Sequence, residues 1–103
     1  MNVKPITSKL DVTLDKAYST WASKILTGGW YCAGAALYCT ANDVITATQN
    51  AREMYEYLPD SYVAIGCFKD AYLILTPDGG LWRLGSKFRS LNITFEKANK
   101  RLK

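Results

Sequence analysis

The sequence predicts one α+β domain spanning residues 1–103, in which an antiparallel sheet of three or four strands packs against two or three helices. A regular apolar stripe of helical spacing crosses residues 44–58, and three short apolar segments separated by turn residues follow at 62–84. The expected order is helix, strand, helix, three strands, helix. A content of 49 % apolar and 21 % charged residues is typical of a globular domain with its own core.

Residues 1–10 are expected to be a loosely ordered lead-in, because a proline and a serine disfavour a helix there. Apolar residues from Leu14 to Ile25 recur at steps of three and four and predict the first helix. We expect Thr13 or Asp11 to cap its start, and Gly28-Gly29 to end it.

The segment from Trp30 to Cys39 has two interpretations. Its aromatic start and the internal Gly34 favour a strand, whereas its alanines favour an apolar helix. The strand is the preferred interpretation, and the helix stays open.

The next helix has the clearest pattern. Thr40 and Asp43 have the spacing of a capping box at its start, and Pro59-Asp60 is expected to stop it. The apolar stripe consists of Val44, Ala47, Ala51, Met54 and Leu58.

Three strands are predicted after this helix, at Tyr62–Phe68, Ala71–Thr76 and Leu81–Leu84. Lys69-Asp70 is a plausible two-residue turn between the first two. Pro77 to Gly80 is a stronger turn, because Pro, Asp and Gly stand in the order that a type I turn followed by a bulge requires.

Residues 85–91 are expected to form a basic loop before a final helix that extends to about Lys103. Asn92 or Thr94 is expected to cap that helix. Its inward-facing residues are expected to be Ile93, Phe95, Ala98 and Leu102.

The residue types present argue against an enzyme. The chain has no histidine, which removes Ser-His-Asp and Cys-His sites and the commonest zinc ligand. Its glycines do not form a phosphate-binding loop, and the Glu53–Glu56 pair lies on an expected polar helix face. We therefore expect no catalytic residues, no metal and no cofactor, with a reactive thiol at Cys39 or Cys67 as the minor alternative.

Three cysteines are an odd number and fit no disulfide framework, which favours a reducing compartment. The chain contains neither an N-terminal signal segment nor an apolar run long enough to span a bilayer. We expect a cytoplasmic protein that does not associate with a membrane.

The charge is distributed unevenly. Residues 1–79 sum to −2, whereas residues 80–103 hold seven Lys or Arg against one acid and sum to +6. Part of this positive charge is expected without any partner, because cations near a helix C-terminus interact favourably with the helix dipole. The remainder indicates a positively charged surface that attracts an acidic partner.

The predicted contact residues are the cations of this region together with two aromatic residues. They are Arg83, Lys87, Arg89, Lys97, Lys100 and Arg101, aided by Tyr72 or Trp82. Strand alternation puts Arg83 on the sheet face opposite Trp82 and Leu84, and we expect Tyr72 or Phe88 beside it.

The resulting functional prediction is a small non-enzymatic protein that binds and modulates, or inhibits, a macromolecular partner, as compact regulators encoded by phages or mobile elements do. A protein with an acidic surface is the favoured partner, and a nucleic acid bound by the same cations is the alternative. A homodimer also stays open, because Leu81–Leu84 and the Trp30 segment are candidate sheet edges.

Overall fold

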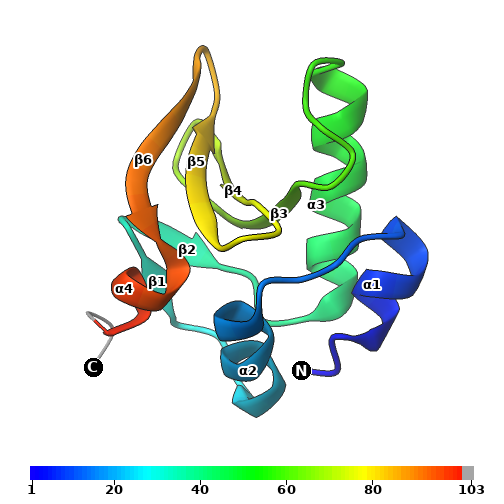
Figure 1. Ribbon diagram of the computed structural model, residues 1–103, viewed down its shortest axis with the longest axis vertical. Coiled ribbons are helices and arrows are strands. Elements are labelled where there is room, and N and C mark those ends of the chain that lie inside the picture. The colour runs from blue at the N-terminus through cyan, green and yellow to red at the C-terminus, as the bar shows by residue number, and fades with distance from the viewer. Residues whose placement is uncertain (101–103) are drawn as a thin grey trace.

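The computed structural model describes the backbone of residues 1–100 and the side chains of residues 1–98. Within this part of the chain, four helices pack around a curled antiparallel sheet of six strands (Figure 1). The α+β class is confirmed, whereas the predicted numbers of strands and helices are too low. The helices are α1 (Lys4–Leu10), α2 (Lys16–Lys24), α3 (Ala41–Met54) and α4 (Phe95–Lys100), and the strands are β1 (Tyr31–Cys32), β2 (Ala35–Leu37), β3 (Val63–Cys67), β4 (Tyr72–Leu75), β5 (Gly80–Leu84) and β6 (Phe88–Thr94).

Each strand pairs with the next one along the chain, even where α3 connects β2 to β3. The segment 30–39 is extended, as preferred, but it forms two strands rather than one. Ala33 and Gly34 both have positive φ, 52° and 86°, which is the geometry of a two-residue type I′ hairpin. The alternative of an apolar helix is wrong, because this hairpin joins the segment to the sheet.

The prediction that residues 85–91 form a basic loop is also wrong. After a short turn, β6 runs antiparallel to β5 from Phe88 onward, so β5 is an inner strand. The prediction that Leu81–Leu84 is a sheet edge is therefore wrong, whereas the Trp30 segment does lead into the edge strand β1. A bulge at Asn92, whose φ is 56°, bends β6 before it meets α4.

The first ten residues are not a loose lead-in. They contain α1, which buries Ile6 completely and packs on α3. Pro5 is compatible with this helix because it lies in the first turn, where a backbone N–H has no intrahelical acceptor to lose.

Helix α2 begins at Lys16, two residues later than predicted. Its cap is Asp15, whose carboxylate accepts a hydrogen bond of 3.1 Å from the Tyr18 N–H, and not Thr13 or Asp11. It ends at Lys24, before Gly28-Gly29.

Helix α3 starts as predicted, with the Thr40 hydroxyl accepting from the Asp43 N–H at 3.1 Å. It ends at Met54 rather than at Pro59, and Met54 is 66 % exposed instead of belonging to the buried stripe. Leu58 lies beyond the helix but is buried.

Helix α4 follows β6 directly, and the Thr94 hydroxyl accepts from the Lys97 N–H at 3.4 Å, so the predicted cap at Thr94 is confirmed. Phe95 and Ala98 are buried as expected. Leu102 lies outside the described residues.

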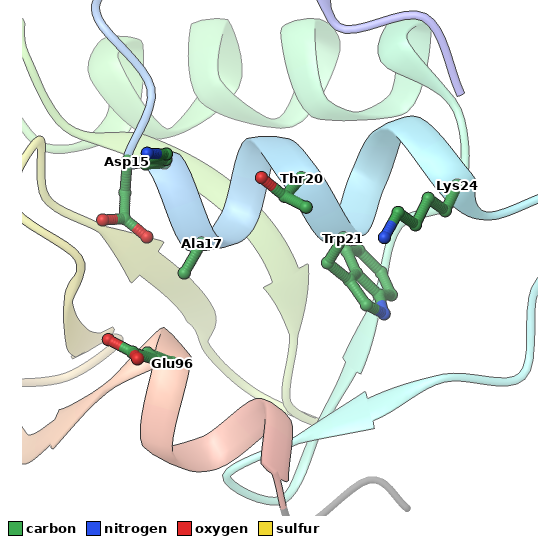
Figure 2. A pocket seen from close by; sticks show the side chains of 7 residues that line it. Asp15, Ala17, Thr20, Trp21, Lys24 and Glu96 are labelled. Carbon is green, nitrogen blue, oxygen red and sulfur yellow. The ribbon is translucent and has the colours of Figure 1, made fainter.

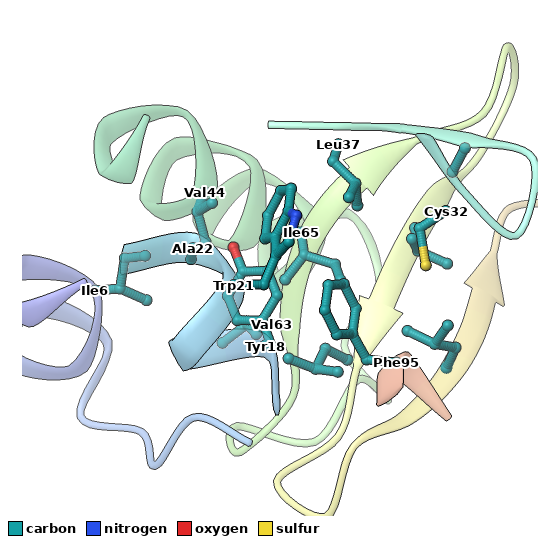
Figure 3. Packing of buried hydrophobic residues seen from close by; sticks show 14 of the residues in the cluster. Ile6, Tyr18, Trp21, Ala22, Cys32, Leu37, Val44, Val63, Ile65 and Phe95 are labelled. Atoms are coloured by element: carbon teal, nitrogen blue, oxygen red, sulfur yellow. The ribbon is translucent and has the colours of Figure 1, made fainter. Parts of the chain in front are cut away.

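The two faces of the sheet carry two apolar clusters. The inner cluster lies beneath α1, α2 and α4, and its largest members include Ile6, Tyr18, Trp21, Ile65, Leu73 and Phe95 (Figure 3). The outer cluster consists of Ala47, Ala51, Leu58, Ala64, Ile74 and Leu84, with the partly exposed rings of Tyr38, Tyr55, Tyr62, Tyr72, Trp82 and Phe88 packed against it.

Candidate functional site

The candidate site is the end of the β5–β6 hairpin, which we call the hairpin tip and define as residues 83–89. Leu84 and Phe88 are the last strand pair, and the Gly85 N–H donates to the Lys87 carbonyl at 3.2 Å. Gly85 is required for packing, because a Cβ there would lie 2.9 Å from the Cβ of Ala71. The tip projects from the sheet at the end away from α2 and α4 (Figure 1).

Three of the predicted cations gather at this tip. Arg83 and Arg89 are directly opposite each other in the strand register, and with Ser86 and Lys87 they line a pocket of about 260 Å³. Like charges directly opposite in an antiparallel pair are destabilising. The pair therefore needs compensation from neighbouring groups.

Two neighbours from the β3–β4 turn compensate Arg83. Its guanidinium donates to the Asp70 carboxylate at 2.6 Å, which is the one ion pair among the described side chains. The same guanidinium lies 4.7 Å from the centre of the Phe68 ring. Lys87 and Arg89 have no acidic partner among the described residues, so their charges remain available.

The predicted aromatic contacts lie on the other face. Tyr72 is paired with Leu84 and Trp82 with Ile74, whereas Arg83 is paired with Leu73. Because side chains alternate along a strand, Arg83 lies opposite Trp82 and Leu84, as predicted. The expectation that Tyr72 or Phe88 lies beside Arg83 is wrong, and Phe68 takes that place.

The remaining predicted cations are not part of the tip. Lys97 lies on α4, which begins after Thr94, and Thr94 pairs with Gly80 at the opposite end of β5. Arg89 and Thr94 are five positions apart along β6, roughly 16 Å of extended chain. The side chain of Lys100 and the whole of Arg101 lie outside the described residues.

An aromatic row on the outer face was not predicted as a site. The Phe88 ring centre lies 4.7 Å from Trp82, 5.9 Å from Tyr57 and 6.3 Å from Tyr62. Tyr57 is 58 % exposed. The sequence signal for this row was a group of three tyrosines within residues 55–62. The sequence places them in one loop but does not indicate that they contact β6.

The minor alternative of a reactive thiol at Cys39 or Cys67 stays a prediction. Cys67 lines a pocket of about 290 Å³ that Tyr72 also lines, and its thiol neighbours the Tyr38 hydroxyl. Burial, and then the neighbouring thiol, raise the pKa of Tyr38, so this phenol is not a general base at neutral pH. Burial likewise raises the pKa of Cys32 to about 11.

Within the described residues, no group of three or more His, Cys, Asp or Glu side chains is placed to hold a metal ion. The helices of this region are all too short or too polar to cross a membrane. No protein-family model, curated protein or solved structure matches the chain.

Proposed function

We propose that this protein is a non-enzymatic binding module that modulates a partner protein by docking the hairpin tip on an acidic surface. The observation that carries the proposal is the cross-strand pair Arg83–Arg89 with Lys87 around one pocket. Asp70 compensates the charge of Arg83, and carboxylates of a partner would compensate those of Lys87 and Arg89.

The residue types suit carboxylates. Arginine presents a planar fork of donors that binds a carboxylate through two parallel hydrogen bonds. Asp70 already makes a contact of this chemistry with Arg83, at 2.6 Å. Arg89 is exposed and offers the same group to a partner.

The alternative is a nucleic acid whose phosphates contact the same three cations. Single-stranded nucleic acids also need aromatic rings on which bases stack. The Phe68 ring beside Arg83 is already covered by its guanidinium, and Trp82 and Phe88 lie on the other face. This arrangement favours a protein partner.

We also propose a cytoplasmic location. Cys32, Cys39 and Cys67 are all free thiols, which is typical of proteins in a reducing compartment.

The test is an affinity capture from the native host with the unmodified protein, the double variant Lys87→Glu/Arg89→Glu, and the control Lys4→Glu/Lys9→Glu. The control makes the same change in charge at exposed positions of α1. We expect nuclease treatment to leave capture unchanged, and the tip variant alone to reduce the affinity for the captured partner at least tenfold, about 1.4 kcal/mol.

Capture that disappears with nuclease, together with a gel shift that weakens steeply between low and high salt, would establish the nucleic-acid alternative. Equal capture by the tip variant and the control would contradict both the proposed protein partner and the nucleic-acid alternative.

A further inference from the structure

The curled sheet leaves a hollow between its two edge strands, β1 and β6, which we call the edge hollow. It has a volume of about 640 Å³. One wall consists of β1 and its turn, residues 31–34, and the other consists of residues 91–93 of β6 with Ala98 of α4. Both edge strands contact α4 (Figure 1). The two edges of the sheet therefore border one shared hollow.

The backbone of Tyr31 has an unpaired N–H and C=O at this edge. In a two-residue hairpin, the residues that flank the turn, here 32 and 35, form a hydrogen-bonded pair. The next pair, Tyr31 and Ala36, is therefore not hydrogen-bonded. The following bond, from the Leu37 N–H to the Trp30 carbonyl at 2.9 Å, fits this alternation. The N–H and C=O of Tyr31 consequently point away from β2, and no described residue hydrogen-bonds with either group.

The walls of the edge hollow carry no charge. None of the eight residues that line it is Asp, Glu, Lys or Arg. The uncharged character continues along the chain, because residues 25–42 contain no charged residue. Edge strands are commonly protected from pairing by charged side chains, Lys above all, whereas β1 has none and its Tyr31 is 59 % exposed. A ligand that fits these walls is uncharged, because a charge there would lose solvation without gaining a partner.

The volume of the edge hollow fits one strand. Neighbouring strands lie about 4.8 Å apart, sheets pack about 10 Å apart, and a strand rises about 3.3 Å per residue, so one strand residue occupies roughly 160 Å³. The edge hollow therefore has room for roughly four residues of a single strand. A second copy of this chain would bring β2 together with β1, because the two form one hairpin, and two strands exceed this space.

We propose that the edge hollow binds an extended, uncharged segment of a partner protein, roughly four residues long, as a strand added to β1. The backbone of this segment accepts a hydrogen bond from the Tyr31 N–H and donates one to the Tyr31 carbonyl. Its side chains alternate, so every second one packs against Leu91, Ile93 and Ala98. The backbone bonds supply affinity, and the apolar walls select uncharged side chains.

The experiment follows the backbone amide resonances of the ¹⁵N-labelled protein by NMR during addition of an uncharged peptide. The probe is N-acetyl-Ser-Val-Ala-Val-Ser-amide. Its matched control is the same peptide N-methylated at its three central residues, which removes their backbone donors. We expect a saturable downfield shift and slower hydrogen exchange of the Tyr31 N–H with the probe, with a Kd on the order of 1 mM or lower. The methylated peptide should bind at least tenfold more weakly.

A second peptide tests the lack of charge in the walls. In N-acetyl-Ser-Glu-Ala-Glu-Ser-amide the two valines are replaced by glutamates, while the backbone donors and acceptors stay the same. We expect it to shift the Tyr31 N–H with at least tenfold lower affinity than the probe, because the edge hollow offers its carboxylates no partner.

Two variants test the two walls. Tyr31→Pro removes the outward N–H but no bond of the β1–β2 hairpin, so this variant should stay folded and lose peptide binding. Leu91→Asp adds a charge to the opposite wall and should weaken binding at least tenfold. The control Leu26→Asp, at a position that is 95 % exposed and does not line the edge hollow, should not. The methylated peptide keeps the test valid if a variant fails to fold, because it leaves the protein unchanged.

A Tyr31 resonance that does not respond to the probe, or equal affinity for the unmodified and the methylated peptide, would overturn the proposal. A Tyr31 shift that depends on protein concentration without peptide would also overturn it, because a second copy would then occupy the edge. The probe has no acidic group, and the edge hollow shares no residue with the hairpin tip. Failure of this proposal would therefore leave the proposed function unaffected.

Discussion

The inner and outer clusters differ in how completely they are covered. The rings of Tyr18, Trp21 and Phe95 in the inner cluster are each at least 92 % buried beneath helices and contact one another. In the outer cluster, α3 covers one part, and the rim consists of partly exposed rings such as Phe88. The inner cluster therefore holds the fold together, while the rim of the outer cluster and the adjoining hairpin tip are free to serve binding.

The largest expected difference between the clusters comes from the same substitution made in each. Phe95→Ala removes a fully buried ring and is expected to cost about 3–5 kcal/mol of unfolding free energy. Phe88→Ala removes a half-buried ring and should cost about 1 kcal/mol. Urea unfolding of both variants measures this difference. Equal losses would mean that the outer cluster is as important to the fold as the inner one.

A second prediction concerns the buried hydroxyl that joins α3 to the sheet. The Thr48 Oγ1 donates to the Val44 carbonyl at 2.7 Å and accepts from the Ala64 N–H at 2.9 Å. Thr48→Val keeps the shape but leaves that N–H unpaired, which is expected to cost about 1–3 kcal/mol. The matched control Thr46→Val, at an exposed position of the same helix, should change stability by less than about 0.5 kcal/mol. A similar effect at both positions would exclude this role for Thr48.

A third prediction is a gain in stability within the inner cluster. The Tyr18 hydroxyl is buried and has no hydrogen-bond partner among the described residues. Tyr18→Phe removes it and should raise the unfolding free energy by about 1 kcal/mol. Tyr62→Phe, at a half-buried ring of the outer cluster, should have little effect. A loss of stability in Tyr18→Phe would show that the hydroxyl has a partner after all.

A fourth prediction is a pH dependence that also belongs to the inner cluster. Burial raises the pKa of Cys32 from an ordinary value of 9.0 to about 11. The folded state then keeps a proton that the unfolded state loses, so stability is complete below pH 9 and declines as the pH rises toward 11. The decline should reach about 1 kcal/mol at pH 10.

Unfolding curves recorded from pH 8 to pH 10 test this dependence, because above pH 10 the buried phenol of Tyr18 adds a decline of the same sign. Cys32→Ala should flatten the curve in that range. An unchanged slope would assign the pH dependence to another group.

Local signals predicted much of this fold. Thr40 as the cap of α3 and the turn from Pro77 to Gly80 were recognised because each depends on a few neighbouring residues. Helix α1 was not predicted because Pro5 disfavours a helix in most positions, whereas its place in the first turn is compatible with one. Strand β6 was not predicted, because its basic residues indicated a loop. In the structure, backbone pairing with β5 makes this segment a strand.

The candidate site also combines features that neighbouring residues predict with features that depend on contacts between distant residues. Arg83, Lys87 and Arg89 belong to the predicted set of contacts because they are close in sequence, and the β5–β6 hairpin, which was not predicted, brings them together in space. The place of Phe68 was not predictable, because it depends on the register between β4 and β5 and on the β3–β4 turn. The sequence did not predict the pocket of about 570 Å³ that α2 lines together with Glu96 of α4, because Trp21 and Glu96 are distant in sequence (Figure 2).

We propose that the hairpin tip gives up stability for binding, and the variant Arg89→Thr tests both properties in one protein. It removes the charge opposite Arg83 and inserts a residue suited to a strand. We predict that the unfolding free energy rises by about 0.5 kcal/mol, while the affinity for the captured partner falls at least tenfold. A variant that is less stable than the unmodified protein and binds the partner equally well would contradict the account.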